Sequence, residues 1–437
     1  MTGPHETPVA SPGGAARARR SVSATAAHRT FALGDQAPRT AVRPETPQAV
    51  AETLRQASEA GRAVVPWGAG TKQGWGNAPR AYDLALDLSA LDRILEYEPA
   101  DLVVTVQAGT PLGALQRRLG EAGQFLALDP PYAASATLGG TLATNASGPS
   151  RLLYGTARDL VLGMQVATPA GDLVKSGGKV VKNVVGYDLN KMHIGGLGTL
   201  GVMTEVTFKV HPLPRTEATV GATFGALGPA QEVAGRLFRS VLYPRAVELL
   251  RAPTPGLEGG PEEWRVLVWC AGSPATVERQ AGDAGDWLQE AGAASVVRLD
   301  GDAHRALWDE VREFGRDLPP HVALVKLSAL PTRIPDLIGA AGRAAGEQNA
   351  APQIVAHAGS GVLYAALPGV SLTALQTLIE EARALGGAAV VEACPPALGG
   401  GLDVWGPTRD DFPLMQALKA QFDPTATLNP GRFLGGI

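Results

Sequence analysis

The chain has 437 residues, of which 45% are hydrophobic and 18% charged, and its formal net charge is −4. This length suggests two or three domains, and the slightly acidic charge gives no indication of a nucleic-acid or anionic-membrane surface. The two cysteines, Cys270 and Cys394, exclude a disulfide framework, lack metal-ligand spacing and are too few for an iron–sulfur cluster. No apolar run is long enough to span a bilayer.

The first 36 residues are rich in Ala, Ser, Pro, Gly and Arg and contain almost no large apolar side chains. Such a segment cannot bury enough surface to offset the entropy lost on ordering, so we expect a disordered tail at residues 1–36. Arg19-Arg20 could begin a twin-arginine export signal, but the hydrophobic stretch that such a signal needs does not follow. We therefore predict a cytoplasmic protein, which would reach the inner membrane only through partner proteins.

The first predicted elements lead to a glycine loop. Thr46 caps a helix with Pro47 at its first position, and residues 63–67 form a short buried strand that runs into the loop GAGT at residues 68–71. A strand that delivers a glycine loop commonly binds a pyrophosphate through main-chain N–H groups. The loop lacks both the Gly-Lys-Ser/Thr of a P-loop and the GxGxxG of a Rossmann unit, so an NAD site is not favoured.

A second glycine-rich block, TLGGTLATNASGPS, occupies residues 137–150. Glycine permits positive φ and a close approach of the backbone to a ligand, and turns of this kind can direct N–H groups at a phosphate. Gly198 and Gly201 repeat the pattern about sixty residues later. Any single glycine is best explained as a loop turn, but the ordered set predicts a long, flat, phosphate-bearing ligand lying along the backbone.

Strands surround these glycine blocks. They are predicted at residues 84–88, 102–107, 160–168, 173–175 and 202–210. A helix capped by Thr110, with Pro111 at its first position, should follow the second of them. The last strand alternates apolar and polar residues, which predicts that only one of its faces is buried.

Pro212 and Pro214 mark a boundary, after which one structural pattern occurs twice. Residues 218–299 and 322–394 each read as βαββαβ. Two such units side by side would form one antiparallel sheet with helices on one face. The predicted fold class is therefore α+β, with an α/β domain at 37–213, an α+β lid domain at 214–421, and a C-terminal segment at 422–437.

Four stretches together resemble the FAD-dependent oxidoreductases of the vanillyl-alcohol oxidase type, which have a PCMH-type FAD-binding domain. They are PWGAGT (66–71), TLGGTLATNASGPSRLLYG (137–155), NVVGYDLNKMHIGGLGTLGVMTEV (183–206) and FDPTATLNPGRF (422–433). The resemblance covers about residues 41–437, and within the family the chain looks most like the FAD-binding subunits of glycolate oxidases. It implies FAD between the two parts of the first domain, with a sister FAD subunit and an iron–sulfur subunit as partners.

The resemblance also implies which residues bind FAD. The first loop would hold the pyrophosphate, the second block would line the ADP half and reach toward the flavin, residues 201–202 would contact the adenine side, and the tail would return to the isoalloxazine ring. The implied residues are Gly68, Ala69, Gly70, Thr71, Thr137, Gly139, Gly140, Asn145, Ser147, Gly148, Gly201, Val202, Asn429 and Arg432. For the tail, a simple proline turn is the alternative. No histidine follows the first loop, so we expect non-covalent FAD.

The lid retains few of the catalytic residues that the resemblance would suggest. Relatives that oxidise D-lactate or D-2-hydroxyglutarate have a GHxGDGNxH motif and a later EHG, which supply metal ligands and a base. The corresponding stretches here, VAHAGSGV (355–362) and VEAC (391–394), keep only His357 and Glu392. These two rarely complete a divalent metal site, so no metal is predicted. Both are candidate catalytic residues, and the alternative for each is a purely structural role.

Three functions remain open at this point. The first is the FAD-binding subunit of a glycolate or other 2-hydroxyacid oxidase complex that passes electrons to a partner iron–sulfur subunit. The second is a self-sufficient FAD-dependent oxidase or dehydrogenase of another small alcohol or 2-hydroxyacid such as D-lactate. The third is a flavin-bearing scaffold without catalysis. A carboxylate substrate would need a cationic anchor, for which Arg432 is a candidate by position alone.

Overall fold

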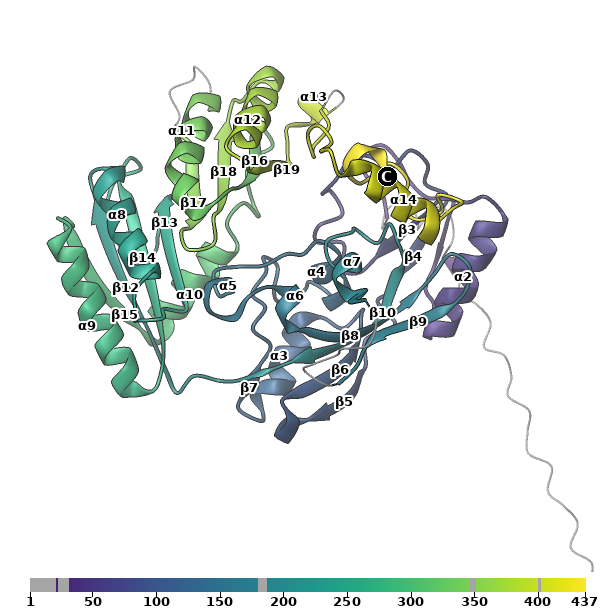
Figure 1. The fold of residues 1–437 in the computed structure, drawn as a ribbon, viewed down its shortest axis with the longest axis horizontal. Coiled ribbons are helices and arrows are strands. Elements are labelled where there is room, and N and C mark those ends of the chain that lie inside the picture. The colour runs from purple at the N-terminus through teal and green to yellow at the C-terminus, as the bar shows by residue number, and fades with distance from the viewer. Residues whose placement is uncertain (1–20, 23–30, 180–186, 346–350, 400–401) are drawn as a thin grey trace, which may run out of the picture.

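The computed structural model describes residues 21–22, 31–179, 187–345, 351–399 and 402–437. Within these residues the strands form sheets of four, five, two and eight strands (Figure 1). Among the described helices, none is both long and apolar enough to cross a membrane.

Most of the tail expected at residues 1–36 lies outside the described residues, but its last part is packed. Phe31 is only 7% exposed, and its ring packs edge-on against Trp67 with the ring centroids 5.2 Å apart. The Phe31 carbonyl also accepts a hydrogen bond of 2.9 Å from the Tyr82 hydroxyl. The packed chain therefore includes Phe31, and does not begin at residue 37 as expected.

The first sheet has the strand order β1-β2-β4-β3, and both β2 and β3 run parallel to β4. Its strands are β1 (Ser21–Val22), β2 (Thr40–Val42), β3 (Val64–Trp67) and β4 (Leu84–Asp87). Helix α2 (Pro47–Glu59) connects β2 to β3 and packs its apolar face on this sheet. It begins as predicted, because Thr46 Oγ1 accepts a hydrogen bond from the Ala49 N–H at 3.1 Å.

The second sheet is antiparallel, with the order β5-β6-β10-β8-β9. Its strands are β5 (Ile94–Glu98), β6 (Val103–Gln107), β8 (Val161–Ala167), β9 (Leu173–Gly177) and β10 (Val202–Lys209). The expectation that β10 buries only one face is wrong: Met203 and Thr207, predicted to face solvent, are 5% and 8% exposed. Both faces are covered because Val202 packs in the core beneath α2, whereas Met203 packs in the core formed with α3 and α4.

Shorter elements connect the strands of this part of the molecule. They are η1 (Pro99–Asp101), α3 (Leu112–Gly120), β7 (Gln124–Phe125), α4 (Leu138–Ala143), α5 (Arg151–Tyr154), α6 (Ala157–Leu160), α7 (Asn190–His193) and β11 (His211–Pro212), which pairs with β7. Thr110 does not cap α3 as predicted. Pro111 is the N-cap instead. It forms an isolated bridge with Thr137, and the Leu112 N–H donates a hydrogen bond to the Ala136 carbonyl at 2.8 Å, so the helix begins only at Leu112.

The largest sheet has eight strands in the order β15-β12-β14-β13-β17-β18-β16-β19, and every neighbouring pair is antiparallel. Its strands are β12 (Thr216–Phe224), β13 (Ala246–Arg251), β14 (Trp264–Gly272), β15 (Ser295–Asp300), β16 (Val322–Ser328), β17 (Gln353–His357), β18 (Val362–Pro368) and β19 (Ala388–Ala393). Four helices join them: α8 (Leu227–Phe238), α9 (Pro274–Glu290), α11 (Ile334–Ala344), which follows η2 (Pro331–Arg333), and α12 (Leu372–Ala384). The doubled βαββαβ prediction is confirmed.

These four helices form one large apolar core with a single face of the eight-stranded sheet (Figure 1). Helix α10 (Gly301–Arg312), which the sequence analysis did not identify, packs on the opposite face through Leu307 and Trp308. It lies between the two repeats and belongs to neither of them. The opposite face is otherwise free to carry polar side chains toward the first two sheets.

The chain ends against the first sheet. After α13 (Pro396–Gly399) and α14 (Phe412–Phe422), Leu428 forms an isolated parallel bridge with Val64 of β3. The Val64 N–H donates to the Thr427 carbonyl at 2.7 Å, and the Asn429 N–H donates to the Val64 carbonyl at 2.9 Å. The final turn is η3 (Leu434–Gly436). The C-terminal segment therefore lies beside the loop that follows β3, as Figure 1 shows.

Candidate functional site

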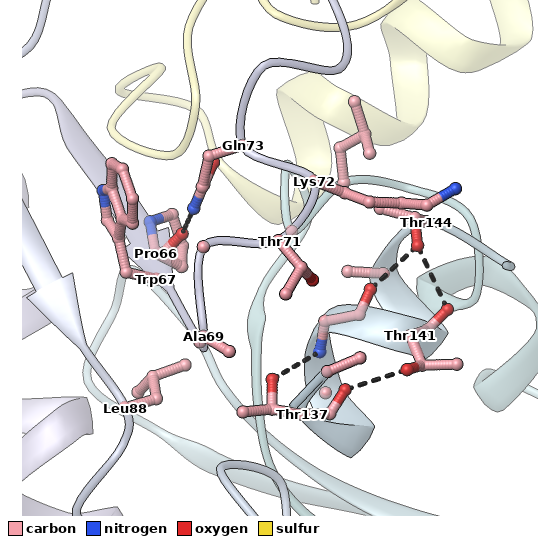
Figure 2. A pocket seen from close by; sticks show the side chains of 18 of the residues that line it. Pro66, Trp67, Ala69, Thr71, Lys72, Gln73, Leu88, Thr137, Thr141 and Thr144 are labelled. Atoms are coloured by element: carbon pink, nitrogen blue, oxygen red, sulfur yellow. Dashed lines mark hydrogen bonds between the residues drawn. The ribbon is translucent and has the colours of Figure 1, made fainter. Parts of the chain in front are cut away.

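A cavity of about 910 Å³, part of it open to solvent, lies where the loop after β3, helix α4, the start of β10 and the C-terminal segment meet (Figure 2). Its wall includes most of the residues implicated from sequence: Gly68, Ala69, Gly70, Thr71, Thr137, Gly139, Gly140, Gly201, Val202, Asn429 and Arg432. Segments that are far apart in the chain therefore contribute to the wall of one cavity.

The second glycine block is partly helical, which differs from the expected row of turns. Thr137 caps α4, and its hydroxyl accepts a hydrogen bond from the Gly140 N–H at 3.3 Å (Figure 2). A Cβ on Gly139 would lie 3.0 Å from Ala108, so this glycine permits close packing. A Cβ on Gly140 would have only Thr137 Oγ1 within 4 Å, at 3.0 Å. Gly140 therefore presents open space to the cavity.

Three residues of that block are not part of the wall. Gly148 and Ser147 serve the local fold, because the Gly148 N–H donates to Asp129 Oδ1 at 3.1 Å and Ser147 Oγ accepts from Arg151 Nη1 at 3.2 Å. A Cβ on Gly148 would lie 2.0 Å from the Asp129 carbonyl oxygen. Asn145 adopts a left-handed conformation with φ of 47°, and its Oδ1 is buried without a partner among the described residues.

Arg432 holds the loop that follows β3. Its guanidinium donates hydrogen bonds to the Gln73 side chain at 2.7 Å and to the carbonyls of Gln73 and Trp75 at 2.6 and 2.7 Å. Burial lowers the pKa of Arg432 to about 10. Because Arg432 makes these three bonds within the protein, its geometry favours a structural clamp on the loop over the carboxylate anchor considered from sequence.

The cavity fits the flat, phosphate-bearing cofactor expected from sequence. Gly68 lies so close to Thr137 that a Cβ would be 2.1 Å from the hydroxyl, and Gly70 has a φ of +77°. Because these two residues have no side chains, the backbone of the loop itself forms the surface of the cavity there and can contact a ligand directly. Three buried polar atoms of wall residues, Trp75 Nε1, Arg432 Nε and Asn429 Oδ1, have no partner among the described residues. They are available to a ligand that supplies both donors and acceptors.

A row of five polar side chains crosses the face of the eight-stranded sheet that lies opposite the four-helix core. We call it the polar row; it consists of Glu248, His357, Tyr364, Lys326 and Glu392, on the adjacent strands β13, β17, β18, β16 and β19. The first four lie directly between residues of the helix-covered core. Because side chains alternate along a strand, these four project from the other face.

Glu248 and His357 form the most buried pair of the row. They are opposite each other in the β13–β17 ladder, and His357 Nδ1 lies 2.7 and 2.9 Å from the two carboxylate oxygens. Glu248 is 1% and His357 5% exposed. Burial raises the pKa of Glu248, while His357 acts in the opposite direction. With Nδ1 bonded to the carboxylate, His357 Nε2 remains free to accept a proton.

Glu392 connects the polar row to the first cavity. It is the extra residue of a β-bulge, because Val325 and Leu324 pair with Val391 and Ala393. Bulges redirect side chains, and here Glu392 Oε2 lies 3.5 Å from Nζ of Lys72, which is in the wall of the cavity. Glu392 Oε1 is buried without a partner among the described residues.

Lys326 and Tyr364 are directly opposite each other in the β16–β18 ladder. In the polar row they lie between Glu248 and Glu392. The Lys326 ammonium lies 5.9 Å from the centre of the Tyr364 ring. Burial lowers the pKa of Lys326 to about 8 and raises that of Tyr364 well above its usual value. Arg151, at the start of α5, is among the charges that act on both.

The structure thus brings together the two predicted catalytic candidates, His357 and Glu392, on one sheet face. Sequence reasoning missed Glu248, Lys326 and Tyr364 beside them. A usable signal was present for two of these, since Glu248 and Lys326 each interrupt an apolar strand, in AVELL and VALVKL. Among the described residues, no group of three or more His, Cys, Asp or Glu side chains is arranged to hold a metal ion.

Comparisons with known proteins agree with this geometry. The family described as "FAD binding domain" matches residues 38–177, and the family described as "FAD linked oxidases, C-terminal domain" matches residues 407–433. The chain is 30% identical over 429 residues to an FAD-linked oxidoreductase of Mycobacterium tuberculosis, with 92% of each chain covered. It is 28% identical to glycolate oxidase subunit GlcD of Bacillus subtilis, over 90% of this chain and 88% of that one.

Among solved structures, the fold is similar to an alkyldihydroxyacetonephosphate synthase with a TM-score of 0.68. The match covers 91% of this chain and 78% of that one at 18% sequence identity. At this identity the likeness concerns the fold alone, and it agrees with the two-part cofactor-binding region followed by a large antiparallel sheet.

Proposed function

The chain belongs to the FAD-linked oxidoreductases, and from this premise we propose that it is the FAD-binding subunit of a glycolate or other 2-hydroxyacid oxidase or dehydrogenase complex. FAD is its cofactor. The observation that carries the proposal is the polar row on the sheet face opposite the four-helix core. It supplies a buried His–Glu pair and one lysine, Lys326, that has no ion-pair partner among the described residues. The similarity to GlcD along nearly the full chain supports the choice of substrate class.

In this proposal FAD occupies the cavity between the loop after β3 and helix α4. The backbone of residues 68–71 and the start of α4 would hold it, and the C-terminal segment would close the cavity through Asn429. FAD supplies the hydride acceptor when bound. No histidine lies in the loop at residues 68–77, which supports the expectation of a non-covalent cofactor.

His357 is the proposed base for the hydroxyl proton of the substrate. Its Nδ1–H donates to Glu248, which fixes the tautomer in which Nε2 is the acceptor. As Nε2 takes up a proton, the ring becomes positively charged, and the Glu248 carboxylate stabilises that charge. Glu248 is therefore a positioning residue for His357 in this scheme, and does not itself contact the substrate.

The test compares the isolated chain with the chain co-expressed with the flavoprotein and iron–sulfur partners. We expect slow or no anaerobic bleaching of the flavin by glycolate or D-lactate in the isolated chain, and rapid bleaching in the complex. Rapid bleaching in the isolated chain would contradict the complex and support a self-sufficient oxidase or dehydrogenase. The complete Glu248–His357 pair within this chain is the observation that favours this second candidate.

A third outcome concerns the scaffold function. If the protein retains FAD but neither the isolated chain nor the complex reduces it with any 2-hydroxyacid, both catalytic proposals fail. The chain would then be a flavin-bearing subunit whose lid serves as an interaction surface.

A further inference from the structure

We propose that Lys326 and Arg151 together bind the carboxylate group of the substrate; this rests on the proposed function above and names the anchor of the same site. The two cations come from separate parts of the chain. Lys326 lies on β16 of the eight-stranded sheet, and Arg151 begins α5 next to the second glycine block. Helix α5 contacts β13, and a Cβ on Gly359, two residues after His357, would lie 2.6 Å from Cδ1 of Leu152, the residue next to Arg151. Arg151 therefore lies at the Glu248–His357 end of the polar row, and its charge is among those that lower the pKa of Lys326.

Neither cation has an acidic partner among the described residues. Lys326 forms no ion pair and no hydrogen bond there, and its nearest described aromatic contact is the Tyr364 ring at 5.9 Å. Arg151 donates one hydrogen bond, from Nη1 to Ser147 Oγ at 3.2 Å, which leaves most of its five N–H donors free. Buried or partly buried cations in proteins are normally paired, so this arrangement lacks an anion.

The carboxylates nearby already have other partners. Glu248 is bonded to His357 Nδ1 through both oxygens, and Glu392 Oε2 pairs with Lys72. Asp129, which also acts on Glu248, accepts hydrogen bonds from the backbone N–H groups of residues 148 and 150 at 3.1 and 2.8 Å. Glu392 acts on Lys326, and Arg151 on Glu248, only at longer range, and none of the three carboxylates forms an ion pair with either cation. We therefore assign the missing partner of the two cations to a ligand.

The neighbouring groups favour a carboxylate as this ligand. The planar guanidinium of Arg151 matches a carboxylate in two parallel hydrogen bonds, and Lys326 adds a point charge. The Tyr364 hydroxyl has no hydrogen-bond partner among the described residues, and burial keeps its pKa well above its usual value, so it stays a donor. A carboxylate held here would bring the adjoining hydroxyl-bearing carbon of a 2-hydroxyacid toward His357, whose ring centre is 5.8 Å from that of Tyr364.

The experiment measures binding of oxalate, a carboxylate that cannot donate a hydride, to the FAD-loaded full chain by titration calorimetry. We expect Lys326→Met and Arg151→Met each to weaken oxalate binding at least about tenfold, and Lys326→Arg to restore most of the affinity. Lys175→Met is the matched control, because that side chain is 74% exposed on the surface, and it should leave the affinity unchanged. Unchanged oxalate affinity in both Lys326→Met and Arg151→Met would overturn the proposal.

Two further readouts separate the alternatives. If inorganic phosphate competes as strongly as oxalate, the pair is a general anion site and the carboxylate assignment is wrong. If Lys326→Met loses FAD while the loaded fraction binds oxalate normally, the cation serves the cofactor and the proposal is also wrong. Failure of the proposed function would be recognised separately. If oxalate binding depends on Lys326 but neither the isolated chain nor the complex oxidises any 2-hydroxyacid, the carboxylate site is supported and the proposed activity is contradicted.

Discussion

Two lysines withdrawn from solvent differ in how the protein satisfies them. In the C-terminal segment, the Lys419 ammonium donates to Asp423 Oδ2 at 2.6 Å and to the carbonyls of Thr199 and Leu428 at 2.8 and 2.9 Å. On the eight-stranded sheet, Lys326 has no such partner among the described residues. Burial lowers the pKa of both. The same residue type therefore completes the fold in one region and leaves a charge for a ligand in the other.

This difference indicates that the C-terminal segment around Lys419 stabilises the fold, whereas the region around Lys326 is arranged to bind a ligand. Every donor of Lys419 is used to connect α14, the turn before β10 and the returning tail, which together support one side of the cofactor cavity. Among the described residues, the polar row keeps two groups without a partner, the Lys326 ammonium and Glu392 Oε1, and most donors of the neighbouring Arg151 are also free. A protein tolerates such desolvated groups where a bound ligand supplies their missing hydrogen-bond or ion-pair partners.

The largest expected effect tests this comparison directly. Lys419→Met should destabilise the protein by about 3–5 kcal/mol, because it removes the cation paired with the Asp423 carboxylate. That carboxylate is 0% exposed and would then depend chiefly on the Thr427 and Leu428 N–H groups. Lys326→Met should change the free energy of unfolding little or raise it, since it removes a cation that has no partner. Chemical denaturation of the two ligand-free variants measures both. A large loss of stability in Lys326→Met would show that its charge serves the fold.

The second prediction concerns a glycine of the cavity wall, where an added side chain would fill space that FAD is proposed to occupy. Gly140→Leu should lower FAD affinity at least about 100-fold, which is about 2.7 kcal/mol, because its side chain would enter the cavity. The melting temperature of the cofactor-free protein should hardly change. Gly120→Leu is the matched control. A Cβ on Gly120 meets no atom within 4 Å, whereas one on Gly140 meets only Thr137 Oγ1, and Gly120 lies at the end of α3 outside the cavity wall. Full FAD occupancy in Gly140→Leu would mean that this wall does not bind the cofactor.

Much of the fold could be predicted because the local signals were strong. The Thr46–Pro47 helix start and the doubled βαββαβ pattern depend on capping and short-range periodicity, which the sequence carries directly. Burial of both faces of β10 could not be read in this way, since it follows from the two separate cores, one with α2 and one with α3 and α4, between which the strand lies. Helix α10 was missed because it lies between the repeats.

The candidate site was predicted less completely, for a physical reason. The glycine loops are contiguous in sequence, so their role in a cavity could be anticipated. The polar row uses one residue from each of five strands, and their proximity arises only from the strand order β13-β17-β18-β16-β19. Arg151 illustrates the same limit, because its relation to Lys326 depends on how the second glycine block faces the large sheet.

A third prediction separates the base from the anchor within the polar row. Glu248→Gln preserves a hydrogen-bonding group opposite His357 but removes the charge that stabilises a protonated ring. We expect turnover of the active complex to fall about 10- to 100-fold, with a changed pH–rate profile. Oxalate affinity and FAD content should remain within about twofold, because neither depends on this pair in our scheme. A loss of oxalate binding equal to the loss of turnover would contradict the division into base and anchor.

The smallest expected effect is the pH dependence of anion binding, and its sign follows from the pKa of Lys326. This pKa is lowered to about 8, chiefly by burial; Glu392 acts against the shift, while Lys72 and Arg151 add to it. Lys326 is therefore protonated below about pH 8 and loses its charge as the pH rises above it. Since the bound carboxylate needs the ammonium, oxalate affinity should be level below this pH and fall about tenfold per pH unit above it.

Substitution distinguishes Lys326 from the other groups that face the ligand. Lys326→Arg should abolish the fall, because the guanidinium stays protonated throughout the range from about pH 7 to 9.5. Tyr364, on the neighbouring strand, should not contribute, because burial keeps its pKa well above its usual value. An affinity that declines equally in the wild type and in Lys326→Arg would attribute the titration to another group. That result would also remove the contrast between Lys419 and Lys326, because Lys326 would then not be the cation that pairs with the ligand.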